Sequence, residues 1–405
     1  MKKALLGLAV ILLLLITILA FRAETAFENR QLEPAAGLGE VDLDSEAAVQ
    51  RFAGALRFAT VSHDDRSNFD AEAFTGMHDY LEQTYPLVHR HAQRTTINRY
   101  SLVYHLPGSD ASLKPVLLMG HMDVVPVQED TLPDWTHPPF AGTVDDTTIW
   151  GRGSVDDKLT VIALLEAMEK LLSEGVQPRR SIYLAFGHDE EVGGMDGAAN
   201  VAKHFQEQGV EFEFVMDEGG AISQGMMGDI TDPVAIIGIS EKGYVNLVLT
   251  VKAPGGHSSQ PPSQTALGIL SRAIVKVEDN PFPARLDFIY PTFDAIGYKM
   301  PFSRRLVMAN LWLFGPLVRH HMVQNQDDAP GVRTTTAATM ASGSPKSNIL
   351  PTRAEAVINF RILPGETVES VKERVVELID DDRVEVVAEF GINPSQVSPT
   401  DSLGF

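Results

Sequence analysis

The chain of 405 residues carries 54 acidic and 33 basic side chains, for a formal net charge of -21. This charge argues against nucleic acid as a partner, because a nucleic-acid-binding surface needs a basic footprint. Cysteine is absent, which excludes disulfides and thiolate metal sites, so a bound metal would have to use His, Asp and Glu.

The first predicted element is an N-terminal hydrophobic helix. Lys2 and Lys3 precede the uncharged run ALLGLAVILLLLITILAF, Ala4 to Phe21. Its length lies between a long signal-peptide core and a short membrane span, and its basic flank predicts a cytoplasmic N-terminus. Because no good cleavage sequence follows, we predict that residues 1–22 are a signal anchor, with the rest exported and facing outside the cytoplasm. A cleaved signal peptide, and hence a secreted protein, is the alternative, and residues 23–44 are predicted to be a linker.

From Ser45 onward, predicted helices and strands alternate. Apolar residues recur at helical spacing in 45–60, 70–86, 156–175 and 197–209. Short β-rich runs occupy 101–107, 115–120, 181–186 and 211–216. This alternation is typical of βαβ units, so we predict an α/β domain with a mostly parallel sheet over residues 45–239.

The following region has a different pattern. Strands are predicted in 243–255, 334–343, 354–363 and 383–390, and helices in 265–279 and 366–379. Two helices against antiparallel strands predict an α+β domain over residues 240–391, inserted as a lid. The stretch 281–330 is rich in Phe, Leu and Met; it is either a buried lid element or a segment that covers a pocket or contacts lipid.

Acidic residues and one histidine fall at the predicted strand ends. In an open α/β sheet the carboxyl ends of the strands share one edge, where ligands bind. We therefore expect these side chains to converge, and a divalent metal is their natural counter-charge. Imidazole with carboxylates suits zinc, with manganese or cobalt as alternatives. The residues concerned are His121 and Asp123, Asp156 and Asp157, Glu190 and Glu191, and Asp217 and Glu218.

The spacing within two of these pairs suggests a division of labour. His121 and Asp123 are two residues apart, so in an extended strand one would bind metal while the other orients it. Glu190 and Glu191 are adjacent and would diverge, one toward metal and one toward substrate as general base. Each pair alone is more simply a surface turn, a helix N-cap or a solvated face. Their joint occurrence in one α/β rhythm favours a metal site.

Five motifs in this order resemble a known family: GHMDVVPV, GRGSVDDK, FGHDEEVGG, MDEGG and PGGHSSQPP. Together they are similar to the zinc-dependent aminoacylase/carboxypeptidase family of metallopeptidases. The stretches ANLWLFGPLV, VRTTTA and NFRILPG resemble its branch of carboxypeptidase S and N-fatty-acyl-amino-acid synthase/hydrolases. The resemblance covers the chain from about Ser45 to its end.

The resemblance implies a hydrolase with two zinc ions. His121 and Asp217 would bind one metal, Glu191 the other, and Asp156 would bridge both. Asp123 would orient the ligands without binding metal itself, and Glu190 would be the general base. The resemblance also implies a cis peptide bond between Asp156 and Asp157.

Further site residues are expected in the second domain. His257, in PGGHSSQ, resembles a histidine that stabilises the tetrahedral oxyanion. Asn348 and Arg361 are candidate contacts for a substrate carboxylate, although a structural salt bridge explains the arginine equally well. A homodimer through the lid is a further expectation.

The chain departs from the family pattern at its C-terminal end. The family takes its last metal histidine from a segment that returns to the catalytic domain, whereas the last histidine here is His321. Residues 392–405 are interpreted as the start of that return, and activity is expected to be impaired. The predicted function is cleavage of N-acyl amino acids or short peptides at the C-terminal residue. The alternative is a catalytically inactive metal-binding or interaction protein of the same fold.

Overall fold

The computed structural model describes residues 2–31, 42–225 and 230–405, which divide into two compact units. The mixed-sheet unit comprises Ala35–Gly220 and Asp401–Phe405, and the antiparallel unit comprises Met1–Pro34 and Ala221–Thr400. The predicted boundaries after residues 239 and 391 remain predictions. The predicted linker, 23–44, includes residues 32–41, which lie outside the described residues.

The mixed-sheet unit is built on a five-stranded sheet with the order β1-β2-β6-β3-β7. The β6–β3 and β3–β7 pairs are parallel, and the β1–β2 and β2–β6 pairs are antiparallel. The strands are β1 (Gln93–Ile97), β2 (Ser101–Leu106), β3 (Val116–His121), β6 (Ile182–Gly187) and β7 (Val215–Met216). The α/β class is confirmed, and the sheet is mixed rather than mostly parallel.

The antiparallel part has a local cause that the sequence did not reveal. β1 was not predicted, and it joins β2 through a tight turn in which Asn98 and Arg99 adopt positive φ angles of 46° and 75°. Such a short connection is compatible only with antiparallel pairing, whereas a parallel pair needs a long crossover. β7 is also shorter than the predicted strand 211–216.

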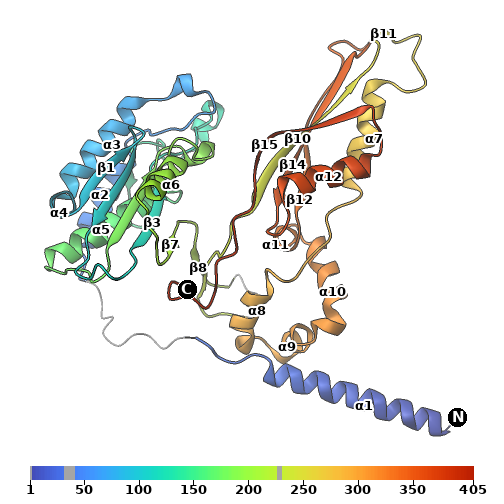
Figure 1. The fold of residues 1–405 in the computed structure, drawn as a ribbon, viewed down its shortest axis with the longest axis horizontal. Helices are drawn as coiled ribbons and strands as arrows, with labels where there is room; N and C mark the ends of the chain where they lie inside the picture. The colour runs from blue at the N-terminus through green and yellow to red at the C-terminus, as the bar shows by residue number, and fades with distance from the viewer. Residues whose placement is uncertain (1, 32–41, 226–229) are drawn as a thin grey trace. The chain divides into compact units, whose positions relative to one another are not determined.

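Helices cover both faces of this sheet (Figure 1). α2 (Ser45–Ala55), α3 (Ala71–Thr84), α4 (Pro86–His91) and α5 (Lys158–Ser173) pack on one face, and α6 (Ala198–Glu207) on the other. Strand β2 serves both layers, because Leu102 and Tyr104 face the first core and Val103 faces the second. Shorter elements are η1 (Arg66–Asn68), η2 (Glu129–Asp134), η3 (Glu190–Val192) and the hairpin of β4 (Thr143–Val144) and β5 (Ile149–Trp150).

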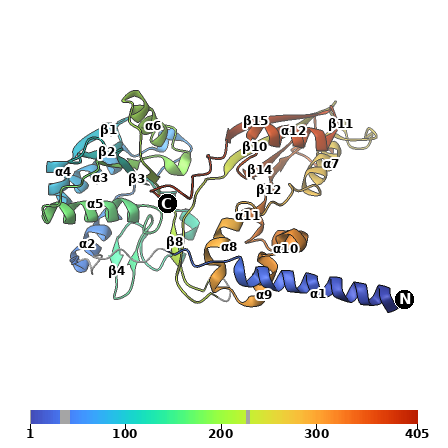
Figure 2. The ribbon, with the colours of Figure 1, turned by 60° about the horizontal axis from the view of Figure 1, so that its bottom comes forward.

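The antiparallel unit contains a four-stranded sheet with the order β12-β14-β10-β15. Its strands are β10 (Gly243–Lys252), β12 (Thr335–Ser342), β14 (Arg353–Ile362) and β15 (Val384–Ile392). α7 (Ala266–Glu278) and α12 (Val368–Ile379) bury their apolar faces against it (Figure 2). The predicted helices and strands of this α+β region are therefore present. Two small ladders join β8 (Ala221–Ser223) to β9 (Val234–Ile236) and β11 (Gly256–His257) to β13 (Ile349–Leu350).

The N-terminal helix packs against one of the remaining helices of this unit, α9 (Phe302–Met308). α1 (Lys2–Thr25) is long and apolar enough to cross a membrane, a test that a signal sequence also passes. A small core that includes Phe27, Met300 and Met308 lies at its end. The elements between α7 and β12 are α8 (Tyr290–Ile296), η4 (Gly297–Lys299), α9, α10 (Leu311–Gln324) and α11 (Ala329–Val332).

Candidate metal centre

Three parallel strands of the mixed-sheet unit deliver acidic residues to one sheet edge. β3 ends at His121, which pairs with Gly187 at the end of β6, and the chain leaving β6 continues into Glu190 on η3. β7 pairs with the other side of β3 and leads into Asp217. Asp156 arrives from the segment before α5. The convergence expected from strand-end placement is therefore present in this unit.

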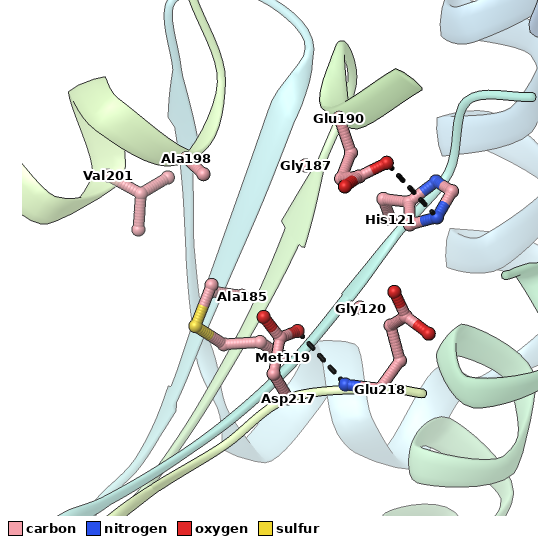
Figure 3. A pocket seen from close by; sticks show the side chains of 10 residues that line it. All are labelled: Met119, Gly120, His121, Ala185, Gly187, Glu190, Ala198, Val201, Asp217 and Glu218. Carbon is pink, nitrogen blue, oxygen red and sulfur yellow. Dashed lines mark hydrogen bonds and ion pairs between the residues drawn. The ribbon is translucent and has the colours of Figure 1, made fainter. Parts of the chain in front are cut away.

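A compact group of potential ligand atoms lies at this edge. One atom each from His121, Asp156 and Glu218 lies within 4.8 Å of the others. A cavity of about 60 Å³ adjoins it, lined by His121, Glu190, Asp217 and Glu218 among others. Figure 3 shows the carboxylates of Glu190 and Glu218 on either side of the His121 ring. The carboxylate of Asp217 instead accepts the backbone N–H of Glu218 at 3.0 Å.

The His121 ring is held from both of its nitrogens. Nδ1 lies 3.0 Å from the carbonyl oxygen of Asp123, to which it donates. Nε2 lies 2.9 Å from Oδ1 of Asp156 and 3.8 Å from Oε2 of Glu190. Because the carbonyl fixes the proton on Nδ1, Nε2 is the nitrogen available to a metal.

The charge of His121 depends on the surrounding acids. Burial lowers the pKa of this 2% exposed imidazole, but a hydrogen bond with Asp123 and the charges of Asp123, Glu190 and Asp157 outweigh burial and raise it to about 10. In the protein alone the ring is thus an imidazolium, which supplies part of the positive charge that the cluster requires.

Asp123 organises the backbone next to the cavity. Its buried carboxylate accepts the N–H of Glu190 with one oxygen and the N–H of Glu191 with the other, both at 3.1 Å. Burial raises the pKa of Asp123, but hydrogen bonds from His121 and Ser62 lower it by more. The pKa of Asp123 therefore lies below its ordinary value. Asp123 therefore stays ionised and fixes the positions of both glutamates.

The other carboxyl groups are difficult to ionise together. Burial and the nearby carboxylates raise the pKa of Glu190. Burial and Asp156 raise the pKa of Glu191 to about 6, and burial and Asp157 raise that of Glu218 to about 7. Acids brought together in this way favour a cation between them, and one imidazole with carboxylate oxygens is a donor set that zinc accepts. The residues present therefore fit a divalent metal.

The sequence placed Asp157 and Asp189 among the acids of this edge without giving either a specific role, and both are buried there. Asp157 accepts the backbone N–H of His121 at 3.2 Å and the hydroxyl of Thr160. It approaches β3 closely, since a Cβ added to Gly120 would lie 2.7 Å from its Oδ2. Asp189 accepts the N–H groups of Asp196 at 2.8 Å and Gly197 at 2.7 Å. The doubled acids were a signal, but adjacency does not reveal which carboxylate turns inward.

The peptide bond between Asp156 and Asp157 is cis, as the resemblance implied.

The three site residues expected in the second domain lie in the antiparallel unit. His257 is exposed on β11, where its Nδ1 accepts the N–H of Ser259 at 3.1 Å. Asn348 is close to it, because its carbonyl accepts the N–H of Ser258 at 3.1 Å. Arg361 lies elsewhere, near the end of β14, with its guanidinium 4.9 Å from the ring centre of Tyr244. The structure thus brings His257 and Asn348 together and leaves Arg361 apart from them.

Comparisons with known proteins agree with this architecture. A family model described as "Peptidase family M20/M25/M40" matches residues 117–400. The chain is 42% identical to "Probable carboxypeptidase S-like 2" of Dictyostelium discoideum, over 88% of this chain and 69% of that protein. It is 39% identical to "N-fatty-acyl-amino acid synthase/hydrolase PM20D1" of Xenopus tropicalis, over 88% of this chain and 70% of that protein.

Solved structures show the same fold at low sequence identity. Human carnosine dipeptidase 1 matches with a TM-score of 0.59 at 16% identity, covering 88% of this chain and 79% of that one. The M20 family metallo-carboxypeptidase Sso-CP2 from Sulfolobus solfataricus matches with a TM-score of 0.58 at 19% identity, covering 87% and 79%.

The fold and the acidic site define a hydrolase of the metallopeptidase class, with a candidate site for the divalent metals that such enzymes use. More narrowly, the chain belongs to the M20/M25/M40 peptidase family, with carboxypeptidase S and N-acyl amino acid hydrolases among its relatives.

Proposed function

We propose that this protein is a two-metal amidohydrolase that cleaves N-acyl amino acids or short peptides at the C-terminal residue. The observation that carries the proposal is the group of His121, Asp156 and Glu218, whose potential ligand atoms lie within 4.8 Å at the carboxyl edge of a sheet. The names of the relatives, a carboxypeptidase S and a synthase/hydrolase of N-fatty-acyl amino acids, support this substrate class.

The proposed metal is zinc, with manganese or cobalt as alternatives. His121, Asp156, Glu191 and an acid of the Asp217–Glu218 pair would hold the two ions. We favour Glu218 over Asp217, because its carboxylate belongs to the ligand cluster while that of Asp217 accepts a neighbouring N–H. Bound there, zinc would lower the pKa of water and polarise the scissile carbonyl.

The proposed general base is Glu190. Its carboxylate faces the cavity, and its raised pKa makes it a stronger base than an ordinary glutamate. It would take a proton from the attacking water and deliver it to the nitrogen of the leaving amine. Asp123 would contribute by holding the Glu190 backbone in place.

Residues of the antiparallel unit would bind the substrate. Because Nδ1 of His257 accepts an N–H, its Nε2 carries the ring proton of the neutral form and can donate to an oxyanion. Asn348 and the exposed guanidinium of Arg361 are proposed contacts for the substrate carboxylate. A lid role for this unit remains part of the proposal.

Two statements concern the setting of the enzyme. We propose that α1 anchors the exported chain in a membrane, with secretion after cleavage as the alternative. We also propose a homodimer through the antiparallel unit. Its strand β12 lies at an edge of the four-stranded sheet and exposes its residues from Ala337 to Ser342, so a second copy could pair with it.

A substrate screen tests the function. Purified chain, loaded with zinc or manganese, is incubated with N-acyl amino acids of short and long acyl chain and with dipeptides, and released amine is measured. We expect hydrolysis that chelator abolishes and that Glu190→Gln lacks. Glu207→Gln, which alters an exposed glutamate of α6, is the matched control and should retain activity. Tight metal binding without hydrolysis of any substrate would favour the alternative, an inactive metal-binding protein.

A further inference from the structure

One helix of the antiparallel unit exposes an apolar face. On α10 the side chains of Trp312, Leu313 and Leu317 are 60%, 42% and 63% exposed. Trp312 and Pro316 are four residues apart and share a side of the helix, as do Leu313 and Leu317, and the two pairs adjoin in one exposed face. A helix facing water normally places polar residues there, and a contiguous apolar face marks a surface that contacts something else.

The segment that leads into α10 contacts the apolar helix α1. Arg22 of α1 donates from Nε and Nη2 to the carbonyl of Ala309, at 3.0 and 2.9 Å. The buried Asn310 donates to the carbonyl of Leu19 at 3.1 Å, and Glu24 pairs with Arg305 at 3.4 Å. Figure 2 shows α1 running beside α9. The last turns of α1 are therefore part of this fold, and a chain cut after Phe21 would lose the hydrogen bond between Leu19 and Asn310.

These contacts determine where α10 lies along the length of the apolar helix α1. Ala4 to Phe21 is about 27 Å long as a helix, close to the roughly 30 Å thickness of a bilayer's hydrocarbon core. Leu19 lies near the end of that run, and Asn310 links it to Trp312, whose Nε1 donates to Asn310 Oδ1 at 3.3 Å. Trp312 thus lies at the level where α1 would leave the hydrocarbon, the depth at which tryptophan is enriched in membrane proteins.

The polar end of the same helix suits a lipid surface. Arg319 is exposed beyond the apolar half of α10, in a chain whose net charge is -21, and His320 and His321 beside it are exposed polar side chains. A basic side chain next to an apolar helix face is typical of helices that lie in a bilayer interface.

We propose that α1 is retained as a membrane span and that α10 lies in the membrane–water interface beside it, with Trp312, Leu313 and Leu317 inserted among the lipids. The occupant of the exposed face is therefore the bilayer itself. This inference is independent of the hydrolase activity, since it rests on no residue of the metal centre.

Tryptophan fluorescence tests the depth of Trp312. The chain has three tryptophans, so Trp135→Phe with Trp150→Phe leaves Trp312 alone. The full chain is reconstituted into phosphatidylcholine–phosphatidylserine vesicles with lipids brominated either near the head group or near the chain end. We expect blue-shifted emission and loss of at least about half of it with the shallow bromine, as for a residue about 5–10 Å below the surface. Emission typical of water that no brominated lipid quenches would overturn the proposal.

A matched probe controls for adsorption. Val376 is an exposed residue of α12, a helix that lies away from α1 in both ribbon views (Figures 1 and 2). Val376→Trp, with the three native tryptophans replaced by Phe, should not be quenched. Equal quenching at both positions would contradict a specific placement of α10. Blue-shifted but unquenched Trp312 would mean that protein rather than lipid covers the face, and would also overturn the proposal.

Charged substitutions and the chain mass complete the test. Leu313→Glu with Leu317→Glu should remove most of the Trp312 quenching while the chain stays in the membrane through α1, whereas Leu267→Glu on the exposed face of α7 should leave quenching unchanged. Quenching that survives the double substitution would count against insertion. Intact mass of the chain extracted from cell membranes should include residues 2–25, and a chain processed within or after α1 would refute retention.

Discussion

The carboxylate of Asp123 and the backbone N–H of Glu190 are joined by a hydrogen bond of 3.1 Å, parallel to a second one to Glu191. One buried acid thereby fixes the positions of the proposed base and a proposed metal ligand. It also contacts His121, whose Nδ1 lies 3.4 Å from Asp123 Oδ1. The geometry of the site therefore depends on a side chain that does not face the cavity.

Asp123→Asn should weaken both the metal site and turnover. The amide nitrogen would face a backbone N–H and leave it without an acceptor, so the glutamates would shift. Loss of such a supporting group typically costs about 10–100-fold in metal affinity or activity, and about 1–3 kcal/mol of stability for an unsatisfied buried group. Zinc titration and urea unfolding measure the two effects. Asp145→Asn, in an exposed turn, is the control, and equal effects of the two variants would remove Asp123 from this role.

Glu190→Gln should bind metal normally and lose turnover. The amide cannot accept a proton from water, and loss of a general base typically costs about a hundredfold to ten-thousandfold in rate. Metal content by elemental analysis and kcat with an N-acyl amino acid give the two readouts. Near-normal kcat in this variant would show that another group is the base.

The Asp217–Glu218 pair can be resolved by comparing two variants. Glu218→Gln should weaken zinc binding more than Asp217→Asn does, because only Glu218 lies within ligand distance of His121 and Asp156 in the described cluster. Competitive titration with a zinc indicator provides the affinities. The reverse order would return the ligand role to Asp217, as the sequence motif suggested.

The metal-free protein should lose stability as the pH rises from about 5 to about 8. Folding raises the pKa of Glu191 to about 6 and that of Glu218 to about 7. A carboxyl group of this kind is protonated more readily in the folded state, so its contribution is complete below the ordinary pKa of about 4.3 and is lost as the pH passes through the raised value. Thermal midpoints in the presence of a chelator report this slope, and a midpoint that rises over this range would contradict it.

Zinc should reverse that dependence. Binding requires Glu191, Glu218 and His121 to release their protons, so affinity increases with pH, and a ligand stabilises the folded state in proportion to the logarithm of its affinity. Calorimetry in buffers of different ionisation enthalpy should detect proton release on zinc binding. A zinc affinity that is independent of pH would argue against these groups as ligands.

The sequence was informative where a feature is local. Helical periodicity predicted α5 and α6, and the positions of strand ends predicted the meeting of His121 with Glu190. The sequence could not predict features set by distant contacts. The positions of Asp217 and Glu218 depend on how β7 pairs with β3, and the packing of Arg22 depends on Ala309, 287 residues away. Neither contact can be recognised from the local sequence around it.

Doubled acids show the same limit on a smaller scale. The motif FGHDEEVGG, which contains Asp189, was one of the signals for the site, yet Asp189 accepts backbone N–H groups at the start of the next segment. Its direction follows from the turn before α6, which brings the N–H groups of Asp196 and Gly197 to it. The conformation of such a turn cannot be predicted from composition alone.

Gly120 restricts how this sequence can diverge. A side chain at this position would occupy the space that Asp157 Oδ2 takes, so Asp157 would move away from β3 and release the N–H of His121. The restriction is one of volume, and it links two positions that are 37 residues apart in the chain. Mutational libraries should therefore recover larger residues at 120 only together with a smaller residue at 157, and the tolerance of either position measured alone would underestimate what the pair accepts.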